Sequence, residues 1–177
     1  MALMASCLGA VAISGAARAM EPLPPRVLQS DKHALVLNGV GTRVMYFMRV
    51  YECALYLPER SRSMPFIMDK RTASAIRISV IHDDLPDRLP EQWREAVRSE
   101  VTTKMFSRLR AAYRDVSGGD VVLFRYVPTE GTWILINDEV VVFDPGHGLM
   151  RSMLEQWVGE TPVSSDLRLA LMGDSNP

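Results

Sequence analysis

Strand-like segments fall into two groups along the chain, with a helical segment between them and further helices at the end. Strands are expected at 34–40, 43–57, 74–81, 121–127, 132–136 and 140–143. Helices are expected at 90–113, at 149–158 and from Ser164 or Ser165 to Gly173. A doubly wound parallel sheet needs strict alternation of strands and helices, which this order does not have. We therefore predict the α+β class, with a mainly antiparallel sheet and helices packed on one face.

Two of these segments need closer description. Residues 43–57 are rich in Val, Tyr and Phe but are long for one strand. We expect two strands there, joined by a tight turn near Phe47-Met48-Arg49 and ended by Pro58. In the segment 90–113 an apolar residue recurs at every fourth position, which predicts one amphipathic helix. The recurring residues are Trp93, Val97, Val101, Met105, Leu109 and Tyr113.

Length and charge narrow the classes of function. The chain has 177 residues, which suits one domain, and 47% of them are apolar. Its 20 basic and 21 acidic residues give a net charge of -1. We therefore expect neither nucleic-acid binding nor strong overall attraction to an anionic membrane. His33, His82 and His147 lie far apart without ligand spacing, so no metal and no cofactor are expected.

The N-terminal residues resemble a secretory signal. Residues 2–13 are apolar and uncharged, and Ala17-Arg18-Ala19 has the form of a signal-peptidase site. We expect cleavage after Ala19, a periplasmic or secreted protein, and no stable membrane insertion afterwards. Two alternatives are a lipoprotein signal ending at Cys7 and a short helix that stays attached. The predicted organisation is a signal peptide at 1–19, a linker and N-terminal segment at 20–33, the domain at 34–173 and a tail at 174–177.

Cleavage after Ala19 would also determine which cysteines remain in the mature chain. Removal of Cys7 would leave Cys53 alone, which excludes a disulfide within the mature chain. Cys53 lies in an apolar strand-like run, so a buried, inert thiol is expected.

Several segments together resemble the chalcone-isomerase-like family. The first is a glycine-rich strand that ends in an arginine, and the resemblance extends from about Leu35 to Gly173. The segments that carry it are Leu37–Arg43, Val50–Leu57, Asp120–Tyr126 with Gly131-Thr132, Gln156–Gly159 and Pro162–Gly173. The resemblance implies an open-faced β-sandwich with an apolar cleft between sheet and helices. Family members include true isomerases, which close a chalcone into a flavanone, and fatty-acid-binding relatives without that activity.

The resemblance implies which side chains supply the polar groups of the cleft. Arg43 matches the family arginine, and its planar fork suits a carboxylate or a developing oxyanion. At the next matching position the isomerases carry a threonine, whereas Tyr51 is what the fatty-acid-binding relatives carry. On one straight strand Arg43 and Tyr51 would lie roughly 26 Å apart, so a shared head group requires the hairpin. Thr103, Met105 and Phe106, on the predicted helix, are expected to line the pocket.

Three functions remain open at this point. The leading hypothesis is a monomer that binds a fatty acid or a similar apolar carboxylic acid without catalysis, through Arg43 and Tyr51. The second is an intramolecular lyase that closes a chalcone-like enone, with Arg43 stabilising the oxyanion. The third is a structural or accessory envelope protein whose cleft is filled by its own side chains.

Overall fold

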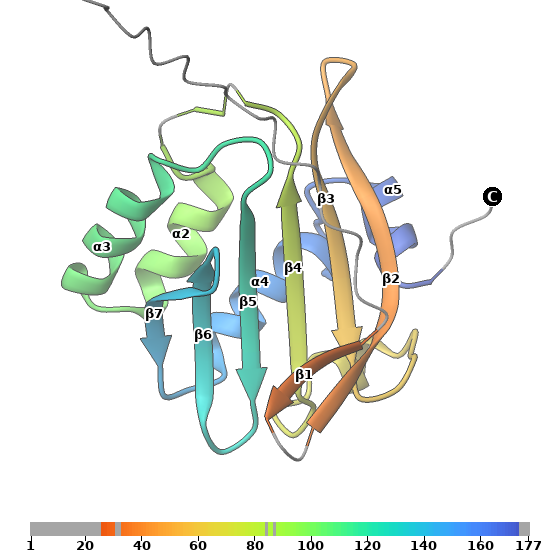
Figure 1. Cartoon of the computed structure of the whole chain (residues 1–177). Helices are drawn as coiled ribbons and strands as arrows, with labels where there is room; N and C mark the ends of the chain where they lie inside the picture. The colour runs from red at the N-terminus through yellow and green to blue at the C-terminus, as the bar shows by residue number, and fades with distance from the viewer. Residues whose placement is uncertain (1–25, 31–32, 84, 87, 174–177) are drawn as a thin grey trace, which may run out of the picture.

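The computed structural model describes residues 26–30, 33–83, 85–86 and 88–173. These residues form one seven-stranded antiparallel sheet in which each strand pairs with the next along the chain (Figure 1). The strands are β1 (Arg26–Ser30), β2 (His33–Met45), β3 (Met48–Leu57), β4 (Ser74–Val80), β5 (Val121–Val127), β6 (Gly131–Ile136) and β7 (Glu139–Asp144). The helices are α1 (Met64–Ile67), α2 (Glu91–Glu100), α3 (Thr103–Tyr113), α4 (Gly148–Val158) and α5 (Ser165–Leu171). The predicted α+β class and the open antiparallel sheet are therefore confirmed.

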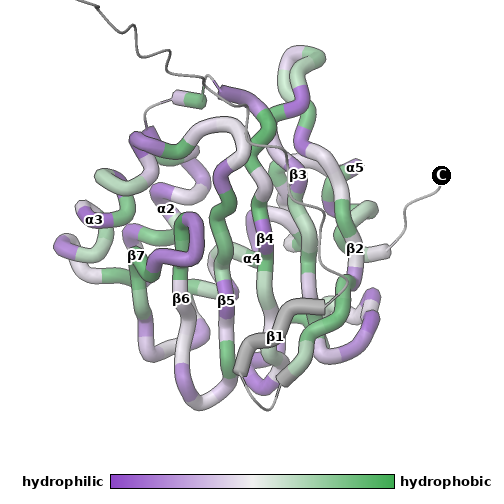
Figure 2. The backbone as a smooth tube through the Cα atoms, viewed as in Figure 1, coloured by the Kyte–Doolittle hydropathy of each residue, from purple (hydrophilic) through white to green (hydrophobic). Residues whose placement is uncertain are grey.

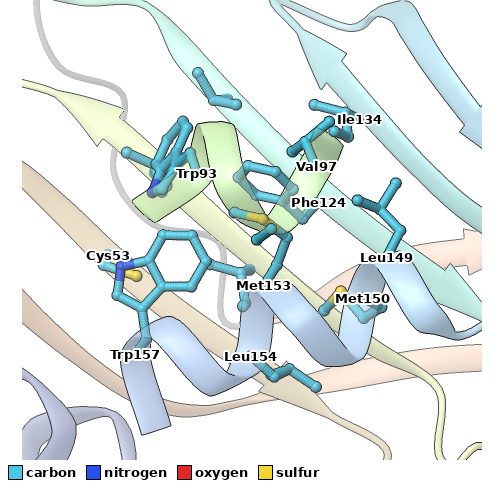
Figure 3. Packing of buried hydrophobic residues seen from close by; sticks show 14 of the residues in the cluster. Cys53, Trp93, Val97, Phe124, Ile134, Leu149, Met150, Met153, Leu154 and Trp157 are labelled. Carbon is cyan, nitrogen blue, oxygen red and sulfur yellow. The ribbon is translucent and has the colours of Figure 1, made fainter. Parts of the chain in front are cut away.

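The main core lies between the sheet and the helices α2 and α4 (Figure 3). Its centre is an aromatic cluster in which the Trp93 ring contacts Phe124 at 5.2 Å and Trp157 at 5.6 Å between centroids, both edge to face. Such edge-to-face pairs stabilise a core beyond the area that they bury. Trp93 comes from α2, Phe124 from β5 and Trp157 from α4, so the cluster fixes both helices on the sheet.

Glycines in β2 allow α5 to approach the sheet closely. A Cβ atom at Gly41 would lie 2.7 Å from the Ala170 Cβ atom, and one at Gly39 would overlap the Ala170 carbonyl oxygen. The amide of Asn38 adds a polar connection, because its Nδ2 donates to the Leu171 carbonyl oxygen at 2.8 Å. The glycine-rich strand β2 thus provides the surface on which α5 packs.

The helical segment at 90–113 is broken, contrary to the prediction of one helix. Val101 has extended backbone, and Thr102 caps α3 by accepting a hydrogen bond from the Met105 backbone N–H at 3.3 Å. Threonine satisfies an otherwise unpaired N–H at a helix start, which favours a new helix at this point. The apolar stripe continues across the break, so its spacing does not reveal it.

All seven residues of β4 are buried, although the alternation of polar and apolar residues from Ser74 to Ile81 is typical of a half-exposed strand. One face packs on the helices. On the other face Leu35, from the start of β2, packs with Tyr56 and Ala75, where β1 and the start of β2 cross the front of the sheet (Figure 1). The segment 20–33, predicted as a linker and N-terminal segment, contains the strand β1.

The predicted signal peptide at 1–19 and tail at 174–177 lie outside the described residues. Within the described part of the chain, no helix combines the length and apolar character needed to cross a bilayer.

Candidate functional site

The hairpin that the sequence required between β2 and β3 is present. Its turn is Tyr46-Phe47, about two residues earlier than predicted, with φ angles of 47° and 68°. Both residues therefore have left-handed backbone, which a two-residue hairpin favours but which is unfavourable by about 1–2 kcal/mol for each non-glycine residue. The usual Asn-Gly signal of such a turn is absent, so the sequence does not mark its exact position.

The register of this hairpin places Arg43 directly opposite Tyr51. Residues opposite each other on antiparallel strands have Cβ atoms about 4.5–5.5 Å apart and project from the same face. The register shifts immediately beyond this pair, with Val44 opposite Arg49, so Val50 forms a β-bulge. Bulges often occur beside binding sites, where they redirect a side chain. Arg43 and Tyr51 are thus brought together, as a shared head group demands.

A pocket of about 470 Å³ lies beside this pair, at the end of the molecule that carries the hairpin. This volume is within the range of small-molecule sites, about 300–1,000 Å³. The sheet side of the pocket is formed by Arg43, Met45, Tyr51, Ile78, Val80 and Val122. The other side is formed by the loop before α2 and by the helices, through Leu85, Pro86, Arg88, Leu89, Trp93 and Tyr113.

The Tyr51 phenol is held in one orientation and stays protonated. Its oxygen accepts a hydrogen bond from the Trp157 indole N–H at 3.2 Å. Burial raises the pKa of Tyr51 far above its usual value, so the phenol remains a neutral hydrogen-bond donor. Burial also raises the pKa of Tyr113, at the helix side of the pocket, to about 12. The O–H of Tyr51 can therefore donate to a ligand while Trp157 fixes its oxygen.

The charges that line the pocket are mainly positive. Arg94 forms an ion pair with Glu91 at 2.6 Å. Arg43 is half-buried, and no carboxylate of the described residues pairs with it. Arg88 adds a second guanidinium to the lining, from the loop before α2. The site therefore presents unneutralised positive charge to a mainly apolar cavity, an environment that suits a monovalent anion.

The other three predicted site residues lie outside this pocket. Thr103 is the first residue of α3 and is exposed, while Met105 and Phe106 are half-buried against the main core. The break before Thr103 turns α3 back, so that only its last residue, Tyr113, reaches the pocket. Eleven residues of helix span roughly 16 Å, which separates the start of α3 from the site.

Sequence reasoning missed several residues of the pocket. Trp93 and Tyr113 were recognised as members of the apolar stripe, and only the break brings them together, with ring centroids 6.0 Å apart. Leu85, Pro86 and Arg88 belong to a loop with no periodic pattern, so no signal marked them. Trp157 does not line the pocket but orients Tyr51, a role that its helical spacing does not indicate.

The sequence also makes predictions about the cysteine thiol and about metal binding. Cys53 is fully buried, and burial raises the pKa of its thiol, which accords with the inert thiol expected. Among the described residues, no cluster of three or more His, Cys, Asp or Glu side chains could hold a metal ion.

Both the sequence and the fold are similar to those of known proteins. Residues 22–173 match the family described as chalcone isomerase-like. The fold is similar to the crystal structure of a fatty-acid binding protein from Arabidopsis thaliana, with a TM-score of 0.58 and 17% sequence identity. That match covers 86% of this chain and 94% of the plant protein. No curated protein sequence matches the chain. Because the family match spans most of the sequence, the chain belongs to the chalcone-isomerase-like family.

Proposed function

We propose that this protein binds a fatty acid or a similar apolar carboxylic acid in the pocket between the β2–β3 hairpin and α2, without catalysing a reaction. Arg43 and Tyr51 hold the carboxylate, and the apolar walls hold the hydrocarbon chain. The fatty-acid-binding function of the structurally similar plant protein supports this proposal.

The observation that carries the proposal is the pairing of Arg43 with Tyr51 at the pocket wall. A guanidinium left without a carboxylate partner in a half-buried position is stabilised when an anion binds it. The neutral phenol opposite it supplies a second donor, so one carboxylate accepts from both side chains. Both groups lie on neighbouring strands of a rigid sheet, which limits the conformational entropy lost on binding.

The walls define the rest of the ligand. Ile78 and Val80 on β4 and Val122 on β5 extend the pocket inward from the arginine, and Trp93 covers them from α2. These side chains offer no charge and few hydrogen bonds to a ligand, so the bound portion must be apolar. An envelope protein with a filled cleft, the structural alternative, would not leave such a cavity beside Arg43.

A titration with a fluorescent fatty acid tests the proposal. The wild-type protein is compared with Arg43→Ala and with Arg98→Ala, which removes an exposed arginine from α2 outside the pocket. We expect saturable binding that Arg43→Ala weakens at least tenfold, about 1.4 kcal/mol, and that Arg98→Ala leaves unchanged. Absence of saturable binding, or equal losses in the two variants, would refute the carboxylate site.

A further inference from the structure

The exposed apolar side chains of this protein are concentrated at one place. Among the described residues, seven large apolar side chains are exposed, and five of them are the consecutive residues Val44 to Met48. Tyr46 is 85% exposed, and Phe47, at 101%, contacts almost nothing. We call residues 44–48 the hairpin tip. It extends past the ends of the neighbouring strands (Figure 1 and, coloured by hydropathy, Figure 2), and its side chains are exposed.

The charged residues that flank the hairpin tip in the sequence are both arginines. Arg43 precedes it and Arg49 follows it, and residues 43–51 contain no acidic side chain. This local charge contrasts with the whole chain, whose net charge is only -1. An uncharged apolar end behind a pair of arginines is complementary to the surface of an anionic bilayer, where phosphates lie above the acyl chains. A protein partner would not require both features together.

The dimensions of the hairpin tip agree with shallow insertion. Three residues of chain, from Val44 in β2 to Tyr46 in the turn, extend about 10 Å. Apolar elements that lie in the interface insert roughly 5–10 Å, to the boundary between head groups and acyl chains. With the tip at that depth, Arg49 lies at the level of the phosphates.

The tip is also continuous with the pocket. Met45 belongs to the tip and lines the pocket two residues from Arg43. Residues two apart on a strand project from the same face, so Met45 and Arg43 form one path from the tip inward. Methionine is flexible and apolar, which suits the passage of a hydrocarbon chain.

From the exposure, charge, length and pocket continuity of the hairpin tip, we infer that it docks the protein on an anionic phospholipid bilayer, with Tyr46 and Phe47 inserted at the interface. Docking places the pocket mouth against the source of its apolar ligand. The inference does not depend on the proposed function, because vesicle binding and ligand binding are measured separately.

Tryptophan fluorescence locates the tip directly. The protein is purified after expression of the full chain, its N-terminus is determined by intact mass, and Tyr46→Trp is compared with Leu169→Trp. Leu169 is the matched control, since it is 46% exposed on α5, away from the tip. Vesicles of phosphatidylcholine with about one-third phosphatidylglycerol carry bromine on the upper acyl chain. After subtraction of the wild-type signal, we expect quenching at position 46 and little at position 169.

Four further variants separate docking from folding and test the contribution of charge. Phe47→Asp should weaken vesicle binding at least tenfold, whereas Leu169→Asp should not. The double variant Tyr46→Asn/Phe47→Gly supplies the residues that the left-handed turn favours, so it should keep or raise the melting temperature while losing vesicle binding. Arg49→Ala should reduce binding about fivefold on the anionic vesicles and leave binding to pure phosphatidylcholine unchanged.

Several results would overturn the inference. One is the absence of quenching at position 46, and another is equal quenching at positions 46 and 169, which would indicate adsorption through a different surface. Sedimentation velocity provides the third, since a dimer that Phe47→Asp dissociates, without vesicle binding, would assign the tip to a second copy of the chain. Fatty-acid titration of Phe47→Asp in vesicle-free solution should match the wild type in every case.

Discussion

The two halves of the β2–β3 hairpin have similar composition but opposite surroundings. In the inner half, where residues 36–42 pair with 52–57, the strand residues from Cys53 to Leu57 are completely buried. In the outer half, residues 44–48 are all exposed. The difference arises from α5 and the core, which cover the inner half and end before the outer one. Apolar sequence therefore predicts a strand but not its burial, and the proposed membrane contact lies in the uncovered half, with the proposed carboxylate site at its boundary.

A matched pair of truncations on β3 gives the largest expected contrast. Leu55→Ala removes a fully buried side chain from the main core and should lower the free energy of unfolding by about 2–5 kcal/mol. Met48→Ala, at the exposed end of the same strand, should change it by less than about 0.5 kcal/mol. Urea unfolding measures both. Equal losses would show that the tip is packed against something in solution.

The contact between α5 and β2 gives the next largest expected effect on stability. Gly41→Val should lower the free energy of unfolding by about 1–3 kcal/mol, because its side chain overlaps Ala170 and Leu167. The double variant Gly41→Val/Ala170→Gly should recover part of this loss, since the two sites are in contact. Strictly additive losses in urea unfolding would contradict the close approach of α5.

At the boundary between the halves, Tyr51→Phe should have a moderate effect on binding. It removes one donor to the carboxylate and leaves the Trp157 indole N–H without an acceptor. We expect fatty-acid affinity to fall roughly fivefold, about 1 kcal/mol, and the free energy of unfolding to fall by about 1 kcal/mol. Trp157→Phe, which frees the phenol but keeps its O–H, should weaken binding less. A larger loss for Trp157→Phe would place the polar contact elsewhere.

The smallest expected effect is a loss of stability in mild alkali. Burial raises the pKa of Cys53 above its usual 9.0, so the folded chain keeps a proton that the unfolded chain releases. Stability is therefore fully present below about pH 8 and declines as the pH passes 9, by less than about 1 kcal/mol at pH 9.5. Cys53→Ala should flatten this decline in urea unfolding between pH 7 and 9.5. An unchanged decline would mean that other groups cause it.

Sequence periodicity predicted most of the strands and helices because the faces that pack on the core repeat regularly. It failed where tertiary contacts decide the outcome. The polar face of β4 is buried because the start of β2 folds over it, a contact between distant segments. Thr102 begins a new helix inside an uninterrupted apolar stripe, and Tyr46-Phe47 turns without the residues that normally mark such turns.

The sequence likewise predicted part of the candidate site and missed the part that depends on tertiary structure. The family resemblance named Arg43 and Tyr51, and their spacing required the hairpin that the structure contains. The prediction of Thr103, Met105 and Phe106 as pocket residues requires one continuous helix, and the break moves them away from the pocket. Arg88 lies in a loop whose path depends on the surrounding fold, so no local pattern indicated it.

Competition between decanoic acid and decanol tests most directly whether Arg43 binds a carboxylate. Each compound displaces a fluorescent fatty acid from the wild-type protein and from Arg43→Ala. We expect the acid to bind the wild type at least tenfold more tightly than the alcohol, about 1.4 kcal/mol, and the two to bind Arg43→Ala within about twofold of each other. Equal binding of acid and alcohol to the wild type, or a preference for the acid that survives in Arg43→Ala, would contradict the carboxylate site.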